Sequence, residues 1–407
     1  MLKTLPVDVF ECRGSPYDVG YQLATGYKKV RRTRARWPQG KLRIGSFDIE
    51  DARRTLLSFA PNIWEELRGI ADGLEITFGE AVAAFSNGRL QYPQRGCSAV
   101  MSGGLYGRNY DFSPRRYDRA LVAAQSTGSF ASIGFADRYT GRVDGMNERG
   151  LCIGLHFVNE AIWRPGLVSI LIVRILLDQC ASTEAAIGLL QRLPHGLGAN
   201  YSLLDADGAA AVVEAMPDRL AVRRGDWLTC TNHFQAGEMQ AANRPNHGSS
   251  KRRLPPLEHW AQNPVDAFAL FHLLNDARSP AFHHNYAAFA GTLHTMVCDP
   301  VKGEMLIGIG GDAAPQVFSV KAWTGGSPLG VDRLKGYLGG KDAKIFAGQD
   351  LSGAEFRDLN LASARFDDIN FVNAEITANC NFKGMRLAGV PVEELLAVYR
   401  RTRGETK

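Results

Sequence analysis

The cysteines of this sequence lack the spacing that disulfide scaffolds and zinc sites use. There are seven among 407 residues, an odd number, and no CxxC pair occurs. Disulfide-rich domains and zinc ribbons need paired cysteines at short intervals. His283, His284 and His294 have no acidic, Cys or His partner at metal-like spacing. We therefore expect reduced thiols, a cytoplasmic location, and neither a metal nor another bound cofactor.

Long apolar runs and a large charge of one sign are also missing. The longest apolar run, residues 167–177, is interrupted by Arg174, whereas a membrane helix needs about 20 apolar residues. The net charge is only +5, too small for a general electrostatic attraction to nucleic acid. The basic cluster at 28–37 favours a solvated helix face over a site for an acidic partner. We expect a protein without a signal peptide that binds neither membranes nor nucleic acid.

The hydrophobic pattern changes near residue 96. Residues 1–96 carry mainly three- and four-residue apolar spacing, which predicts a helical N-terminal segment. Residues 97–325 alternate short apolar stretches with Gly-containing turns, which predicts an α+β domain rich in antiparallel sheet. A stretch rich in Gly and Pro predicts a linker over 326–344.

A period of five residues follows the predicted linker. Bulky apolar residues recur at Phe346, Leu351, Phe356, Leu361, Phe366, Phe371 and Ile376, then after a one-residue slip at Phe382 and Leu387. Neither a helix nor a flat strand has this period. The segment 345–389 resembles the pentapeptide repeats, which implies a short right-handed quadrilateral β-helix. Residues 390–407 then predict a helix that would cap its open end.

Four short motifs carry the side chains of a candidate nucleophilic site. They are Gly96-Cys97-Ser98, GRNYDF at 107–112, GMNERGLCIGLHF at 145–157, and LTCTNHF at 228–234 with GSSKRRL at 248–254. An amide carbonyl is a poor electrophile, so a thiolate with a nearby base is suited to attack it. A cysteine at a chain N-terminus has that base in its own α-amine, whose pKa is about 7.7–8.0. Cys97 is the predicted nucleophile.

The other polar residues of these motifs fit supporting roles. Asp111 would orient the amine, and Arg108 would either fix Asp111 or hold the thiolate. Asn232 would donate a hydrogen bond to the tetrahedral oxyanion. His233 is an alternative base in a papain-like pair with Cys97, but in a strand it would point to the face opposite Asn232.

Together these motifs resemble the N-terminal-nucleophile (Ntn) hydrolases. The nearest branch is the acyl-coenzyme A:6-aminopenicillanate acyltransferase family, with the choloylglycine hydrolases and penicillin V acylases as cousins. The resemblance covers about 10–310 and implies an αββα sandwich of two antiparallel sheets. It also implies self-cleavage between Gly96 and Cys97, leaving chains 1–96 and 97–407.

The resemblance assigns site residues one by one. It places Cys97 on the nucleophile, Arg108 and Asp111 on an Arg-Asn-x-Asp motif, and Asn232 on an oxyanion-hole asparagine. A further active-site arginine falls on Arg253, although Arg252 fits nearly as well. Choloylglycine relatives have asparagine where this chain has His156, which argues against a standard bile-salt hydrolase. We expect His156 and Asn147 to line the substrate pocket.

The predicted function is amide hydrolysis or acyl transfer through an acyl-cysteine. The substrate would be a small N-acyl amide or an acyl thioester such as acyl-coenzyme A, and the sequence does not choose between water and another acceptor. The alternative is a binding or scaffold protein with an inactive enzyme domain. Residues 341–407 hold ten Lys/Arg and ten Asp/Glu, unlike acidic DNA mimics. The repeat would instead support a homo-oligomer or a protein partner.

Overall fold

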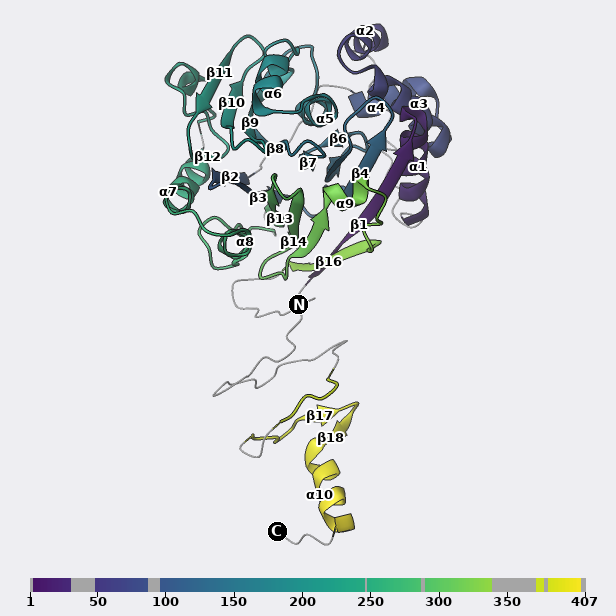
Figure 1. Ribbon diagram of the computed structural model, residues 1–407, viewed down its shortest axis with the longest axis vertical. Coiled ribbons are helices and arrows are strands. Elements are labelled where there is room, and N and C mark those ends of the chain that lie inside the picture. The colour runs from purple at the N-terminus through teal and green to yellow at the C-terminus, as the bar shows by residue number, and fades with distance from the viewer. Residues whose placement is uncertain are drawn as a thin grey trace. The chain divides into compact units, whose positions relative to one another are not determined.

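The chain folds as two compact units, residues 1–349 and 350–407 (Figure 1). The computed structural model describes residues 3–30, 48–86, 96–245, 247–286, 290–338, 371–376 and 380–403. Within these ranges no helix combines the length and the apolar character that crossing a membrane requires.

The larger sheet of the first unit has ten strands among the described residues. In spatial order they are β11 (Leu220–Arg224), β10 (Ala210–Ala215), β9 (Leu197–Leu204), β8 (Cys152–Trp163), β7 (Asp144–Asn147), β5 (Ser132–Asp137), β4 (Ala120–Ser126), β1 (Lys3–Gly14) and β16 (Arg333–Leu338), with β6 (Gly141–Arg142) paired to β5. All of these pairings are antiparallel except that of β1 with β4, which is parallel.

The smaller sheet has six strands in the described part of the chain, all antiparallel. In spatial order they are β12 (Leu228–Cys230), β2 (Gly96–Ser102), β3 (Leu105–Phe112), β13 (Gly291–Asp299), β14 (Glu304–Ile309) and β15 (Gln316–Ser319). Apolar residues of both sheets form one continuous core.

Helices cover the outer faces of the two sheets. The larger sheet packs against α1 (Pro16–Val30), α5 (Ser169–Gln179) and α6 (Thr183–Leu190). Beside α1 lies α3 (Pro61–Leu74), which in turn packs against α2 (Ile49–Phe59) and α4 (Phe78–Ser86). The smaller sheet packs against α7 (Gly248–Gln262), α8 (Ala267–Asn275) and the short α9 (Val320–Thr324), and a 3-10 helix, η2 (Gly237–Ala242), precedes α7. Figure 1 shows this order of helices, two sheets and helices. The predicted mixed α+β class is confirmed.

The turn between β2 and β3 follows directly from the sequence. Gly103 and Gly104 have φ angles of 58° and 74°, values that glycine adopts without the steric cost of a side chain. A two-residue hairpin turn with both φ angles positive matches the twist of the flanking strands. The Gly-Gly turn therefore sets the register that pairs Cys97 with Tyr110.

The N-terminal segment differs from the mainly helical prediction. Its helices are present, but β1 precedes them and lies inside the larger sheet, between β4 and β16. Leu5 and Val7 are buried at alternate positions, a strand signal that the following helical pattern obscured. The predicted linker 326–344 likewise contains β16, where Leu334 and Leu338 are buried.

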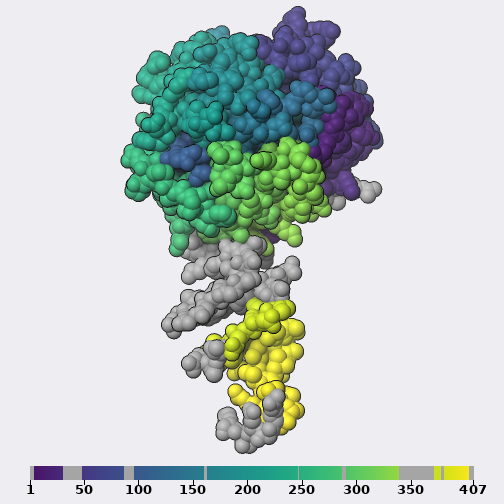
Figure 2. All heavy atoms as spheres, in the orientation of Figure 1, coloured from purple at the N-terminus to yellow at the C-terminus, as the bar shows by residue number. Residues whose placement is uncertain are grey.

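A buried ion pair fastens the N-terminal helices to the rest of the first unit. Both guanidinium Nη atoms of Arg174 on α5 donate to Glu66 on α3, at 2.8 and 3.2 Å, and Nε donates to Asp178. Glu66 and Arg174 are each 1% exposed. Figure 2 shows the purple N-terminal residues lying directly against the teal middle of the unit.

We expect Glu66→Gln to lower the free energy of unfolding by about 3 kcal/mol, because it leaves a buried guanidinium with one carboxylate fewer. Urea denaturation would measure the loss. Glu65→Gln is the matched control, since Glu65 is half-exposed and forms a surface pair with Arg68. Equal unfolding midpoints for the two variants would contradict the importance of this buried pair.

The second unit contains β17 (Arg386–Leu387), β18 (Val390–Pro391) and α10 (Val392–Arg403). Most of the repeat, 345–370 and 377–379, lies outside the described residues, so the β-helix stays a prediction. In the described part, Phe371 and Ile376 are exposed, although the repeat predicts that they stack inside a coil. The capping role of α10 and a partner for this unit also stay predictions.

Candidate active site around Cys97

Cys97 lies on β2, and the alternation of that strand separates two environments. Cys97, Ala99 and Met101 join the core between the sheets, whereas Val100 packs with residues of α7 and α8. The hydroxyl of Ser98 points to the α7 side, where it accepts a hydrogen bond from Arg253 at 2.6 Å. The thiol of Cys97 therefore faces the larger sheet and is buried.

Arg108 lies on the same inner face as the thiol. Its Nη2 is 3.4 Å from Cys97 Sγ, in donating geometry, and its Nη1 donates to Asp144 on β7. Arg108 and Asp144 are both fully buried. This contact supports the interpretation that Arg108 holds the thiolate.

Asp111 occupies the opposite face of β3. Residues three apart on a strand point to opposite sides, so Arg108 pairs with Asp144 and does not fix Asp111. Asp111 Oδ1 accepts a hydrogen bond from Thr292 at 2.7 Å, and Oδ2 is 3.9 Å from Arg253 Nη1. Among the described residues Oδ2 has no hydrogen-bond partner.

The carboxylate of Asp111 lies against Gly96, its partner across the two strands. A Cβ atom at position 96 would be 2.5 Å from Asp111 Oδ2, closer than two such atoms can approach. Only glycine fits this position without displacing the acid. A carboxylate oxygen that accepts no hydrogen bond from the described residues therefore adjoins the predicted cleavage point between Gly96 and Cys97.

Asn232 and Arg253 hold the backbone of Cys97. The backbone nitrogen of Cys97 donates to Asn232 Oδ1 at 2.6 Å, and Arg253 Nη2 donates to the same oxygen at 2.9 Å. Arg253 Nη1 also donates to the Cys97 carbonyl at 2.5 Å. Asn232 Nδ2 donates to the carbonyl of Phe157 at 3.0 Å, which leaves its second hydrogen for another acceptor.

Helix phase explains why Arg253, and not Arg252, reaches the site. On α7 the buried residues are Ser250, Arg253, Leu257 and Ala261, a spacing that defines one helix face. Arg252 is one residue away and exposed. The same periodicity is visible in the sequence and could have resolved the alternative there.

Burial controls the protonation of the two titratable groups nearest the core. It raises the pKa of the Cys97 thiol, and Arg108 opposes this only in part. Burial, together with Arg108 and Arg253, lowers the pKa of His156 well below its ordinary value. At neutral pH the intact chain thus holds a neutral thiol and a neutral imidazole, so Cys97 needs a base to become nucleophilic.

His156 lies on β8 and faces the inner side of the site. Its Nε2 is 2.9 Å from Ser202 Oγ. Its Nδ1 is buried and has no hydrogen-bond partner in the described ranges. A buried, unpaired imidazole nitrogen is available to a substrate group that reaches it.

A chain of buried polar side chains, which was not predicted from the sequence, supports Arg108. Asp144 Oδ2 also accepts from His294 Nε2 at 2.9 Å, and His294 Nδ1 is 2.8 Å from the Tyr117 hydroxyl. A carboxylate only accepts, so the neutral ring donates from Nε2 and accepts from Tyr117 at Nδ1. Asp144 directly precedes the GMNERGL motif, a signal that was visible, but 150 residues separate it from His294.

Other candidate residues make different contacts. Within the described residues, the Asn147 side chain makes hydrogen bonds to the backbone groups of Arg149, Leu151, Leu177 and Cys180. His233 Nδ1 lies 2.8 Å from Ser250 Oγ and 3.1 Å from Thr231 Oγ1, an arrangement that gives no support to the papain-like alternative. The described residues contain no group of three or more His, Cys, Asp or Glu able to hold a metal ion.

Comparisons with known proteins identify a family and several solved structures. A family model for acyl-coenzyme A:6-aminopenicillanic acid acyl-transferase matches residues 100–314, a range that includes Arg108, Asp111, Asn232 and Arg253 but begins after Cys97. A mutant conjugated bile acid hydrolase from Clostridium perfringens is 15% identical, with 63% of this chain and 100% of that chain covered and a TM-score of 0.40. Penicillin V acylase from Agrobacterium tumefaciens is 18% identical, with 55% of this chain and 84% of that chain covered and a TM-score of 0.35. An N-acylethanolamine-hydrolyzing acid amidase orthologue from Caenorhabditis elegans is 15% identical, with 51% of this chain and 93% of that chain covered and a TM-score of 0.36.

Proposed function

This chain belongs to the acyl-coenzyme A:6-aminopenicillanic acid acyl-transferase family, and from that premise we propose that it is a self-processing cysteine Ntn hydrolase or acyltransferase. It cleaves its own Gly96–Cys97 bond and then accepts the acyl group of a linear amide or acyl thioester on Cys97. One observation carries the proposal: two polar side chains contact the two reactive groups of Cys97. Asn232 Oδ1 accepts from the Cys97 nitrogen at 2.6 Å, and Arg108 Nη2 lies 3.4 Å from its sulfur.

Self-cleavage proceeds by attack of Cys97 Sγ on the carbonyl carbon of Gly96. A carbon–sulfur bond forms, the carbon–nitrogen bond breaks, and the nitrogen of Cys97 takes the thiol proton as it leaves. Water then hydrolyses the thioester, which gives the carboxylic acid of Gly96 and the free thiol of Cys97. Asp111 Oδ2 lies beside Gly96 and accepts no hydrogen bond from the described residues, so it is suited to orient that water or accept its proton.

Cleavage converts the Cys97 nitrogen into an α-amine, whose ordinary pKa of about 7.7–8.0 suits a general base near neutral pH. Asn232 Oδ1 keeps this amine beside the thiol, because it already accepts from the same nitrogen. The amine takes the thiol proton, and the buried guanidinium of Arg108 stabilises the thiolate. This arrangement overcomes the raised pKa that burial gives the thiol.

Turnover follows the same bond changes with a substrate carbonyl. The sulfur attacks, and the leaving amine or thiol departs with a proton from the α-ammonium. Water or a second nucleophile then resolves the acyl-cysteine, which releases an acid or a new acyl product and restores the thiol. The free hydrogen of Asn232 Nδ2 is the proposed donor to the oxyanion.

The intact mass of the purified protein tests the proposal. We expect two chains, 1–96 and 97–407, in place of one chain of 44.5 kDa, with N-terminal sequencing beginning at Cys97. Incubation with an acyl substrate should add the mass of one acyl group to the larger chain. An active preparation that consists of a single uncleaved chain would refute the mechanism.

A further inference from the structure

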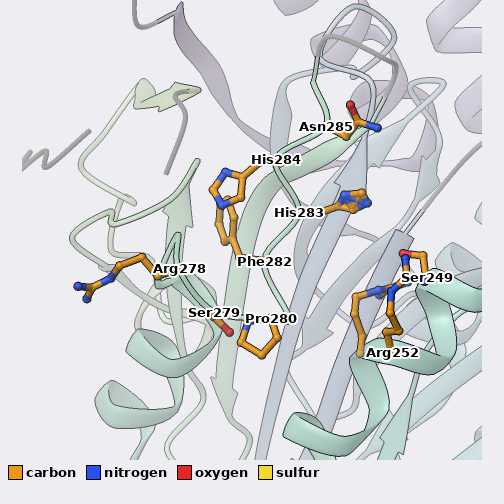
Figure 3. A pocket seen from close by; sticks show the side chains of 10 residues that line it. Ser249, Arg252, Arg278, Ser279, Pro280, Phe282, His283, His284 and Asn285 are labelled. Carbon is orange, nitrogen blue, oxygen red and sulfur yellow. The ribbon is translucent and has the colours of Figure 1, made fainter. Parts of the chain in front are cut away.

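A pocket of about 670 Å³ opens beside the active site. Ten described residues line it, and they include three arginines and two histidines but no Asp or Glu. Its volume lies within the range of about 300–1,000 Å³ that small-molecule sites occupy. Figure 3 shows Ser249 and Arg252 on α7 across from His283, while Arg278 points away from them.

Arg253 connects this pocket to the catalytic residues. It lines the pocket, yet only 4% of it is exposed, and it contacts both the Cys97 carbonyl and Asn232. Its Nε is buried without a hydrogen-bond partner in the described part of the chain. A molecule in the pocket therefore lies next to the group that holds the nucleophile.

The positive charge of the pocket is only partly compensated. Arg278 pairs with Asp276 at 3.1 Å and is largely exposed, so its charge is balanced. Arg252 makes no hydrogen bond or ion pair within the described ranges. It lies in the second turn of α7, whose N-terminus has no side-chain cap, and a helix N-terminus favours an anion.

From these observations we infer that the pocket binds an anionic group of the substrate, a carboxylate or a phosphate, and that Arg252 is the residue that recognises it. The inference rests on the proposed function, since the pocket adjoins Arg253, which holds the backbone of the proposed nucleophile. Arg252 is a specificity residue, because it contacts the charged group and not the reacting atoms. A guanidinium suits both anions, since it donates two parallel hydrogen bonds to either.

Two pairs of probes separate charge from shape. N-hexanoylglycine and N-hexanoylglycinamide differ in one carboxylate. S-Hexanoyl-4′-phosphopantetheine and S-hexanoylpantetheine differ in one phosphate. We expect the charged member of at least one pair to have a KM about 10- to 100-fold lower, as a hydrogen bond to a charged group contributes about 1.5–3 kcal/mol. Preference in the first pair identifies a carboxylate, and preference in the second identifies phosphate.

The variants assign this preference to one residue. Arg252→Gln should remove it, and Arg252→Lys should restore part of it. Arg224→Gln is the control. Arg224 is an exposed arginine on β11, an edge strand of the larger sheet, and it pairs with Glu184 on α6. If a probe is not turned over, the same comparison is made as a binding measurement by calorimetry on the processed protein.

The outcomes separate this inference from the proposed function. Equal KM or affinity for charged and neutral probes would overturn the inference, and so would a preference that survives in Arg252→Gln. Either result leaves processing and the acyl-cysteine unaffected. An uncleaved wild-type chain would instead refute the proposed function, while the binding comparison would still decide whether the pocket selects anions.

Discussion

A Cys97→Ala variant should purify as one uncleaved chain of about 44 kDa and should show no acyl release. In the proposed mechanism the Cys97 sulfur attacks Gly96 and later carries the acyl group, and the substitution removes this atom. We expect activity to fall by at least about 10⁴-fold, the scale that nucleophile removal reaches in acyl-transfer enzymes. Intact mass and substrate turnover measure the two effects independently.

Two further cysteine variants make this test specific. Cys380→Ala, at the one exposed cysteine of the described chain, should be processed and active like the wild type. Cys97→Ser keeps a hydroxyl nucleophile and should be cleaved slowly. Continued acyl release by Cys97→Ala would identify a different nucleophile and would also remove the reason for cleavage at Gly96.

Asp144→Asn should have the second largest effect, although this residue does not touch the thiol. Arg108 would lose its only ion-pair partner in the described chain and become an uncompensated buried cation. Breaking a buried pair in this way costs about 3–5 kcal/mol. We expect that loss in the free energy of unfolding, measured by urea denaturation, together with a fall of about 100-fold or more in processing and turnover.

The dependence of the free energy of unfolding on pH in the acid range provides a second measurement of the role of Asp144. Burial disfavours its charge, but His294 and Arg108 outweigh burial and hold the pKa of its carboxyl below the ordinary value. Its contribution is therefore present above a pH of about 3.9 and is lost as pH falls through the lowered pKa. The variant should lack this component. Asp218→Asn, at an exposed aspartate, is the control, and wild-type stability in both variants would contradict the role of Asp144.

Local pattern was sufficient for some parts of this structure. The Gly103-Gly104 turn, the buried helix around Arg174 and the mixed α+β class follow from turn chemistry and hydrophobic period. Strand alternation could also have separated Arg108 from Asp111, because an odd spacing on one strand places two side chains on opposite faces. The alternative in which Arg108 fixes Asp111 overlooked this geometry.

Contacts between residues far apart in the sequence could not be predicted from local patterns. The contact between Asp144 and His294 joins the two sheets across 150 residues. The sequence around either residue contains no pattern that predicts this contact. The position of β1 depends on β16, which lies more than 300 residues later. A strand this far from its partners can be recognised as a strand, but its place in the sheet follows only from the folded topology.

The interior position of β1 gives self-cleavage a consequence for refolding. While the chain is continuous, the pairing of β1 with its neighbours β4 and β16 during folding is a first-order reaction. In the cleaved form that we propose, the same sheet is assembled from two chains, so its recovery after denaturation would be second-order and would slow on dilution. The precursor would then be the form in which the fold is acquired, and the processed enzyme would persist chiefly through slow unfolding.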